Sequence, residues 1–439
     1  MEKNSTSKIS SSQIFKWIRN SIILILGSAI IGTILLILVA LIPQSAIYDN
    51  VMTSSEVLYE EGTYPSAFSG SRGSQLDNWT DSLMINTAYI SSGNILEDAL
   101  LGTRVIYDDE VEDLTPVEEL YKYLYEDDGT SVAWTYGRYW HGYLVYLKPL
   151  LVIMSLPHIR SLNMFLQLGV IFLLFYILIK KQRDHLCIPV FVAWICMCPA
   201  ALFMSLQFSS IFYPTMLLSI VLVWKHEQLS ALRRCMLFEL CGVLVAYLDL
   251  LTYPLVALGV PLILFIAMDY DKIRSLKERV VQVFIYSVSW MVGYGCMWAS
   301  KWVIASALTG QNVISNAFSA IENRTSRSDG DVTYSWLGVI YTNLSNFKAV
   351  VPVAAILLAV IVFAVLWKRY RKAQLNVPAS LAIMAVSLFP FIWYLVLMNH
   401  SGVHHWFTYR ELVISILGVL TLLFVQLDLN HKKGLQKRQ

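Results

Sequence analysis

The sequence predicts an all-α polytopic membrane protein with about ten transmembrane helices and one large helical loop on the extracytoplasmic side. Two observations lead to this fold class. Of the 439 residues, 56% are hydrophobic and only 15% are charged, so a soluble domain could not cover its surface with polar groups. In addition, apolar runs of about 20 residues recur along the chain, which is the length that crosses a bilayer as a helix.

The first predicted transmembrane helix covers residues 21–43 and follows a polar, basic N-terminal segment, residues 1–20. This apolar run is long enough to span a bilayer, whereas the core of a signal peptide usually has roughly 7–15 residues. We therefore interpret it as an uncleaved signal anchor with a cytoplasmic N-terminus.

The remaining apolar runs predict nine further transmembrane helices and divide the rest of the chain. Residues 161–308 hold six of them, residues 309–348 form a second extracytoplasmic loop, and residues 428–439 form a cytoplasmic tail. Residues 349–427 hold the last three. The predicted helices are 161–179, 187–204, 209–224, 235–252, 254–268, 281–308, 349–367, 379–398 and 411–427.

The positions of lysine and arginine predict the orientation of the chain. If both termini are cytoplasmic, 22 of the 33 Lys and Arg residues lie inside, 10 lie outside and Lys301 lies within a transmembrane helix. Cytoplasmic segments of membrane proteins carry an excess of these residues. The sequence therefore predicts an N-in, C-in topology with an even number of transmembrane helices.

The extracytoplasmic loop, residues 44–160, is acidic and aromatic. It contains 18 acidic residues and is too rich in Tyr and Trp to be a disordered linker. Its patterning predicts helices over 75–90, 94–101 and 116–126, followed over 134–156 by an interfacial or re-entrant helix interrupted by charges and a proline.

Asp77 and Asp81 are the first pair of residues that could carry chemistry. They are four residues apart, so on a helix they would share a face, and repulsion between the carboxylates would raise one pKa. Such a pair suits a catalytic general base or a divalent cation, and no other motif implies a cofactor. The alternative is a solvated acidic face in a loop that is acidic throughout.

A second group lies in the short extracytoplasmic turn over 399–410. His400 and His404 could bind an anion or transfer protons, and Arg410 could pair with a phosphate group through two hydrogen bonds. Alternatively, these side chains anchor the turn among lipid headgroups. The turn lacks the carboxylates or thiols that would indicate a zinc site.

Three further residues are candidates for binding substrate. Arg138 and His141 lie among aromatic residues, where a cation and aromatic rings suit a sugar or a lipid phosphate, although interfacial anchoring predicts the same composition. Lys301 lies toward the outer end of its transmembrane helix, and charged groups at such depth usually face a bundle interior or a wet cavity.

Several function classes lack any sequence signal. No phosphate-binding glycine-rich loop, dinucleotide-binding motif, zinc-protease motif or serine-hydrolase elbow occurs in a fitting context. The basic residues are explained by topology, so no nucleic-acid partner is expected.

In this architecture and in the acidic residues Asp77 and Asp81, the chain resembles the GT-C superfamily of integral membrane glycosyltransferases. It also looks like bacterial surface-polysaccharide proteins in the segments YWHGYL (139–144), KPLL (148–151) and HHWFTYR (404–410). The resemblance implies a polyprenyl-phosphate-linked sugar donor and a glycan or other hydroxyl acceptor. It also implies that Asp77 or Asp81 is the catalytic acid of the first loop, and that Arg410 and Lys301 contact the lipid phosphate.

The resemblance implies a multi-pass protein of the plasma membrane, in bacteria the cytoplasmic membrane, that makes or modifies cell-surface glycans and contacts membrane lipid. Two other functions stay open on the sequence alone. A transporter or flippase for a lipid-linked saccharide would need a polar path across the bilayer and related repeats. A non-catalytic assembly protein would use the acidic loop as a binding surface.

Overall fold

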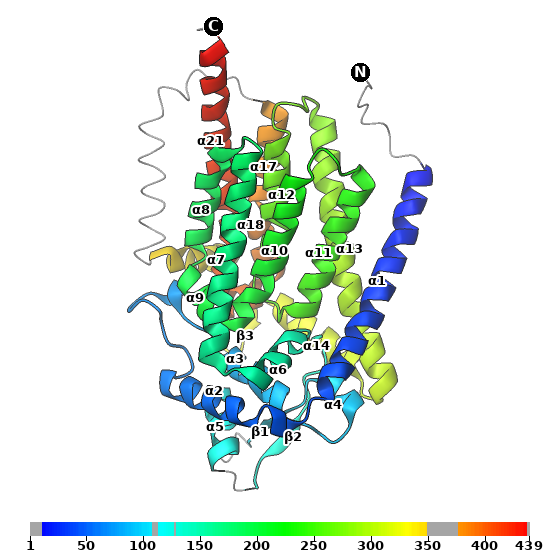
Figure 1. The fold of residues 1–439 in the computed structure, drawn as a ribbon, viewed down its shortest axis with the longest axis vertical. Helices are drawn as coiled ribbons and strands as arrows, with labels where there is room; N and C mark the ends of the chain where they lie inside the picture. The colour runs from blue at the N-terminus through cyan, green and yellow to red at the C-terminus, as the bar shows by residue number, and fades with distance from the viewer. Residues whose placement is uncertain (1–10, 108–112, 127–128, 349–375, 437–439) are drawn as a thin grey trace.

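The computed structural model describes residues 11–107, 113–126, 129–348 and 376–436 as an all-α protein with two very small antiparallel sheets (Figure 1). The helices of the first loop, residues 44–160, are α2 (Tyr48–Glu61), α3 (Asn78–Tyr89), α4 (Ile95–Leu101), α5 (Pro116–Tyr125) and α6 (Leu144–Ile153). The other helices are α1 (Ser11–Ala40), α7 (Leu156–Lys180), α8 (Cys187–Cys196), α9 (Pro199–Met204), α10 (Leu206–Trp224), α11 (Ala231–Leu248), α12 (Val256–Met268), α13 (Leu276–Thr309), α14 (Val313–Thr325), α15 (Trp336–Ser345), α17 (Val377–Ser387), α18 (Phe389–Val396), α19 (Met398–Val403), α20 (His405–Thr408) and α21 (Val413–Gln436). The sheets pair β1 (Arg104–Ile106) with β2 (Val132–Trp134) and β3 (Ser328–Asp329) with β4 (Val332–Thr333).

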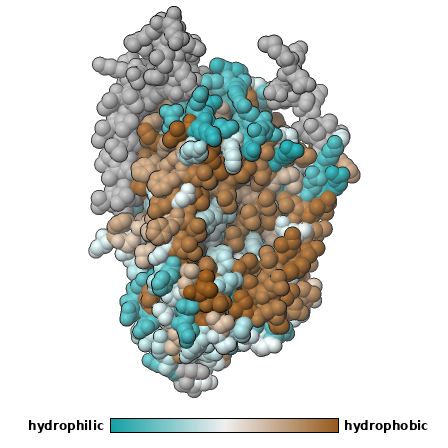
Figure 2. All heavy atoms as spheres, in the orientation of Figure 1, coloured by the Kyte–Doolittle hydropathy of each residue, from teal (hydrophilic) through white to brown (hydrophobic). Residues whose placement is uncertain are grey.

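The long helices run side by side between two ends of the molecule. α1 begins and α21 finishes at one end, which we call the termini end, and α2 to α6 lie at the opposite end, the loop end (Figure 1). Figure 2 shows a hydrophobic band between these two more hydrophilic ends. This distribution of surface hydropathy fits a bundle whose middle is surrounded by lipid.

Among the described residues, six helical segments are long and apolar enough to cross a membrane: Ile14–Ala40, Leu156–Lys180, Leu206–Trp224, Leu276–Thr309, Val377–Val396 and His405–Val425. Each overlaps a predicted transmembrane helix. The chain is therefore a multi-pass membrane protein by the length and composition of its helices.

The other four predicted transmembrane helices do not add to this count. Residues 187–204 form two short helices, α8 and α9, separated at Cys198, whose φ of 59° is left-handed. α11 is interrupted by charged residues, and α12 has only 13 residues. The prediction over 349–367 lies outside the described residues. Ten transmembrane helices and the N-in, C-in topology thus stay predictions.

α11 and α13 pack closely against each other. A Cβ atom at Gly242 would collide with the backbone carbonyl of Trp290, and one at Gly293 would collide with the carbonyl of Glu239. Small residues allow such close approach of backbones in membrane helix pairs, where van der Waals contact drives association. These two glycines therefore fix the distance between α11 and α13.

The loop helices confirm three predictions and correct one. α3, α4 and α5 occupy the predicted positions, and α5 begins with a capping box between Thr115 and Glu118. The segment 134–156 is not one helix, because β2 ends at Trp134 and α6 begins only at Leu144. His141, with a φ of 55°, turns the backbone between them. α2 was not predicted.

Candidate functional site

The first loop and the last helices of the bundle meet in a contact between residues far apart in sequence. The hydroxyl of Tyr409 donates a hydrogen bond to the carbonyl of Gly73 at 2.7 Å. A Cβ atom at Gly73 would collide with the backbone carbonyl of Asn346. Arg72 lies 3.4 Å from the ring of His405. The short helical turn Arg72–Ser74 therefore docks on the 399–410 turn and positions Asp77 next to it.

Asp77 is the N-cap residue of α3, and its side chain is 1% exposed. Its Oδ1 accepts a hydrogen bond from the backbone N–H of Thr80 at 3.1 Å, and its own N–H donates to the hydroxyl of Ser205 at 3.0 Å. Oδ2 is buried with no hydrogen-bond partner among the described residues. Buried carboxylate oxygens are usually paired, so this one is available to a ligand.

Arg410 is fully buried on the opposite side of this junction, in the helical turn Tyr409–Leu412. Its Nε donates to the carbonyl of Met197 at 2.9 Å, and its terminal nitrogens make only long contacts of 3.5 Å to the carbonyls of Trp406 and Gly73. Phe208 lies 4.1 Å from the guanidinium carbon. No carboxylate among the described residues lies within 4.0 Å of it. This buried cation therefore retains capacity for an anionic ligand.

The electrostatics of Asp77 favour acid–base chemistry. Burial raises its pKa to about 6, while the hydrogen bonds from Thr80 and the charge of Arg410 act in the opposite direction. A carboxyl group that titrates near neutral pH is suited to accept a proton in a reaction. Asp77, with one unpaired oxygen, and Arg410, without a carboxylate partner among the described residues, thus lie near each other at one junction.

Asp81 has a different environment from Asp77. Its Oδ2 accepts a hydrogen bond from the backbone N–H of Leu206 at 3.0 Å, and its Oδ1 accepts one from Gln207 at 3.3 Å. It caps the first turn of α10 from another helix, where free N–H groups favour a carboxylate. Burial raises its pKa to about 7, Arg160 opposes this, and Asp77 adds a smaller upward effect. The predicted repulsion between the two acids is present, but burial dominates both pKa shifts.

Aromatic side chains close the junction toward solvent. The ring of Tyr64 lies parallel to that of Trp79 with centroids 6.1 Å apart, and it meets the ring of Trp406 edge-on at 5.2 Å. Tyr64 and Trp79 are exposed at 44% and 37%. The pKa of Tyr64 is raised by burial and by the nearby charge of Asp77. These rings therefore lie near Asp77 at the surface of the junction.

His400 and His404 lie beside an arginine that the sequence analysis did not single out. A terminal nitrogen of Arg324 lies 2.6 Å from Nδ1 of His400, whose Nε2 lies 2.8 Å from the carbonyl of Leu251. The two histidine rings are 4.9 Å apart. Burial, reinforced by Arg324, lowers the pKa of His404 to about 3, so it is neutral at physiological pH. The histidines therefore orient Arg324 rather than supply charge.

Arg138 and His141 lie in the adjoining aromatic segment. Arg138 donates to Asn316 at 3.1 Å and to the hydroxyl of Tyr136 at 2.7 Å. His141 is buried between the hydroxyl of Tyr143 and the carbonyl of Tyr136, at 2.9 and 2.8 Å. Burial and the charge of Lys301 lower the pKa of His141 to about 3. His141 therefore has an internal structural role, whereas Arg138 adjoins the cluster around Arg324 through Tyr136 and Tyr139.

Lys301 lies close enough to His141 to lower its pKa, but its own hydrogen bond is to the backbone. Its ammonium group is fully buried and donates to the carbonyl of Leu100 at 2.6 Å, with the ring of Trp140 at 5.4 Å. Leu100 is in the last turn of α4, where carbonyl groups lack helical partners. The structure thus assigns Lys301 to holding α4 against α13, away from Arg410.

The residues around Asp77 do not fit a divalent cation. Both oxygens of Asp81 accept backbone N–H groups, and Arg410 occupies the same junction. Within the part of the chain that the structure describes, no three His, Cys, Asp or Glu side chains gather in a way that could hold a metal ion. We therefore derive no reaction step through a metal.

The chain matches no protein-family model, no curated protein and no solved structure. Its likeness to the GT-C superfamily is therefore a resemblance of architecture and of a few residues.

Proposed function

We propose that this protein is a membrane glycosyltransferase that transfers a sugar from a polyprenyl-phosphate carrier to a hydroxyl acceptor at the loop end of the bundle. The observation that carries the proposal is the junction of Asp77 and Arg410. A buried carboxylate with a free oxygen lies near enough to a buried arginine for the arginine's charge to lower the carboxyl pKa, and no described carboxylate pairs with that arginine. This pair matches the two charges that develop in transfer from a lipid phosphate.

In the proposed reaction, Oδ2 of Asp77 takes the proton from the acceptor hydroxyl. The acceptor oxygen then bonds to C1 of the sugar, while the bond between C1 and the phosphate oxygen breaks. The electron pair leaves with the polyprenyl phosphate, which gains one negative charge. Arg410 stabilises that charge through hydrogen bonds that strengthen in the transition state.

The surroundings support this assignment of roles. The rings of Tyr64, Trp79 and Trp406 offer flat apolar faces at the entrance, which suit the apolar face of a sugar. Arg324 adds a cation beside the 399–410 turn, and Arg138 adds another on the same tyrosines, Tyr136 and Tyr139, that contact Arg324. Asp81 keeps α3 fixed to α10, so that Asp77 stays at the junction.

The test uses purified protein in lipid nanodiscs with polyprenyl phosphate as the probe. Arg410→Gln is expected to weaken binding roughly 10- to 100-fold, because a hydrogen bond to a charged group contributes about 1.5–3 kcal/mol. Asp77→Asn should bind the probe as the wild type does. Arg327→Gln, which removes an exposed arginine of the 309–348 loop, is the matched control.

Equal binding by wild type, Arg410→Gln and Arg327→Gln would contradict the proposal. Transfer is then measured with a panel of donors in which a radiolabelled sugar is linked to polyprenyl phosphate. The label that appears in a mixture of glycan acceptors gives the amount transferred. A protein that moves intact donor between the leaflets of a vesicle without releasing polyprenyl phosphate would instead be a flippase.

A further inference from the structure

Two adjoining cavities lie at the termini end, far from the candidate site. The first has a volume of about 240 Å³ and is lined by Leu173, Tyr176, Ile177, Lys180, Lys181 and Trp224. The second has about 250 Å³ and is lined by Lys180, Lys181, Gln182, Arg183, His226, Glu227, Met268 and Lys272. Lys180 and Lys181 line both, so the two cavities adjoin at these lysines.

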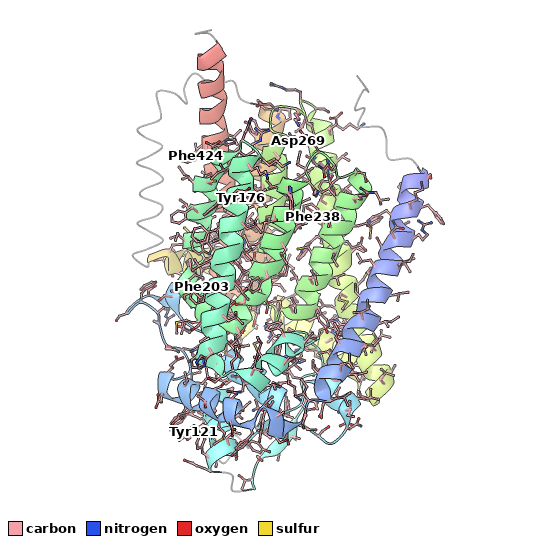
Figure 3. The ribbon with its side chains drawn as sticks, viewed as in Figure 1. Tyr121, Tyr176, Phe203, Phe238, Asp269 and Phe424 are labelled. Carbon is pink, nitrogen blue, oxygen red and sulfur yellow. The ribbon has the colours of Figure 1, made fainter. Side chains whose placement is uncertain are left out.

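The first cavity is apolar and open to the lipid-facing surface. Tyr176 and Trp224 are 59% and 52% exposed, on the neighbouring helices α7 and α10. Tyr176 lies in the upper part of the bundle in Figure 3, near the end that carries Asp269. A groove of this kind between two transmembrane helices accommodates an acyl chain, since its walls are as apolar as lipid.

The second cavity is cationic. Lys272 is already paired with Glu227 at 3.1 Å and lies 3.8 Å from Asp269. Nε2 of His226 lies 2.8 Å from a carboxylate oxygen of Asp269. Lys272 thus faces two acids, and the remaining positive charge of the cavity comes from Lys180, Lys181 and Arg183.

Three further cations line the cavity or its edge, one of which, Lys180, lies 5.6 Å from the ring of Tyr176, and another, Lys181, acts on the charge of Glu227. Within the described ranges, no carboxylate lies within 4.0 Å of Lys180, Lys181 or Arg183. Arg183 donates through one terminal nitrogen to the carbonyl of Met268 at 2.9 Å, and its Nε is buried without a partner. Three positive charges at the mouth of an apolar groove favour a ligand with an anionic head and an apolar tail.

We infer that this pair of cavities is a binding site for an anionic phospholipid. One acyl chain lies in the apolar groove between α7 and α10, and the phosphate lies against Lys180, Lys181 and Arg183. Basic pockets between transmembrane helices recognise anionic headgroups in this way, and each Lys or Arg near the headgroup contributes about a fivefold gain in affinity. The site is independent of the proposed transferase reaction, because it lies at the other end of the bundle.

The experiment measures lipid binding to the full chain by native mass spectrometry and by thermal stabilisation in a neutral detergent. The probes are phosphatidylglycerol, phosphatidylcholine with the same acyl chains, and glycerol phosphate without chains. The double variant Lys180→Ala/Lys181→Ala is compared with Arg274→Ala/Lys277→Ala, which removes two exposed cations at the same end that do not line either cavity.

The inference predicts that phosphatidylglycerol binds more tightly than phosphatidylcholine and that the Lys180/Lys181 variant loses about 25-fold in affinity. The Arg274/Lys277 variant should bind phosphatidylglycerol with the wild-type affinity. Trp224→Ala should weaken the binding of both lipids, because it removes part of the wall of the apolar groove. Equal losses in the two double variants would show a diffuse effect of charge and overturn the inference. Equal binding of phosphatidylglycerol and phosphatidylcholine would also overturn the inference. The same holds if glycerol phosphate alone stabilises the protein as strongly as phosphatidylglycerol does.

Discussion

The carboxylate of Asp81 accepts a hydrogen bond from the backbone N–H of Leu206 at 3.0 Å, across 125 positions of sequence. Asp77, one helical turn earlier, leaves its Oδ2 without a partner among the described residues. Two acids with the same chemistry and almost the same burial thus have different roles. Asp81 stabilises the junction between α3 and α10, and Asp77 offers a free oxygen at it.

Removing the carboxylate of Asp81, which caps the start of α10, is expected to destabilise the protein. Asp81→Ala leaves the buried N–H groups of Leu206 and Gln207 unpaired, and the loss of an N-cap costs about 0.5–2 kcal/mol. The melting temperature in nanodiscs measures the effect. Glu60→Ala, which removes an exposed acid of the same loop, should melt like the wild type. An unchanged melting temperature for Asp81→Ala would show that the cap contributes nothing.

The protonation of Asp77 should depend on Arg410. Burial places the pKa of Asp77 at about 6, and Arg410 lowers it, so Arg410→Gln should raise it further. Asp77 is then protonated at low pH and becomes a competent base only as the pH rises through its pKa. Infrared difference spectra follow the carboxylic acid band with pH, and Asp77→Asn identifies the band. If the titration midpoint of Asp77 does not move in Arg410→Gln, the charge of Arg410 has no effect on the pKa of Asp77.

Replacing Lys301 should affect stability rather than ligand binding. Lys301→Met leaves the buried carbonyl of Leu100 unpaired, which costs about 1–3 kcal/mol. Binding of polyprenyl phosphate should keep its wild-type affinity, because the ammonium group does not reach the Asp77–Arg410 junction. If the variant melts normally but no longer binds the probe, Lys301 is a substrate contact after all.

The close packing of α11 and α13 predicts different effects on stability for substitutions at two glycines of α13, Gly293 and Gly295. Gly293→Ala brings a methyl group against the carbonyl of Glu239, whereas Gly295→Ala meets open space. Gly293→Ala should therefore lower the melting temperature and yield of folded protein. Gly295→Ala should match or slightly exceed the wild type, since alanine favours helix. Equal behaviour of the two variants would show that the helices can separate without cost.

Much of the helical fold could be predicted from hydropathy, because a long apolar run in lipid has few alternatives to a helix. α1, α7 and α13 illustrate this, and the start of α5 followed from Thr115 and Pro116. The break at Cys198 was not predicted, although Pro199 follows it directly and a proline disfavours helical backbone at the residue before it. The helix expected over 134–156 was too long, because the backbone turn at His141 comes from contacts with Tyr136 and Tyr143.

The candidate site was predictable in part. Asp77 and Arg410 stand out as charges in segments otherwise poor in charge, and the structure brings their segments together through Gly73 and Tyr409. The sequence could not distinguish Asp77 from Asp81, because the partner of Asp81 is the start of α10. Arg324 was missed, since only its contact with His400 separates it from other arginines of the outer loops.

The most direct test of the account compares sugar transfer by Asp77→Asn and Asp81→Asn in a single-turnover assay with a radiolabelled polyprenyl-phosphate-linked sugar. General-base catalysis contributes roughly 10²- to 10⁴-fold, so Asp77→Asn should lose at least about a hundredfold in the rate of transfer. It should still bind polyprenyl phosphate normally. Asp81→Asn should be less stable yet transfer at a rate within about tenfold of the wild type, because its role is structural. Full transfer by folded Asp77→Asn would contradict the assignment of Asp77 as the base.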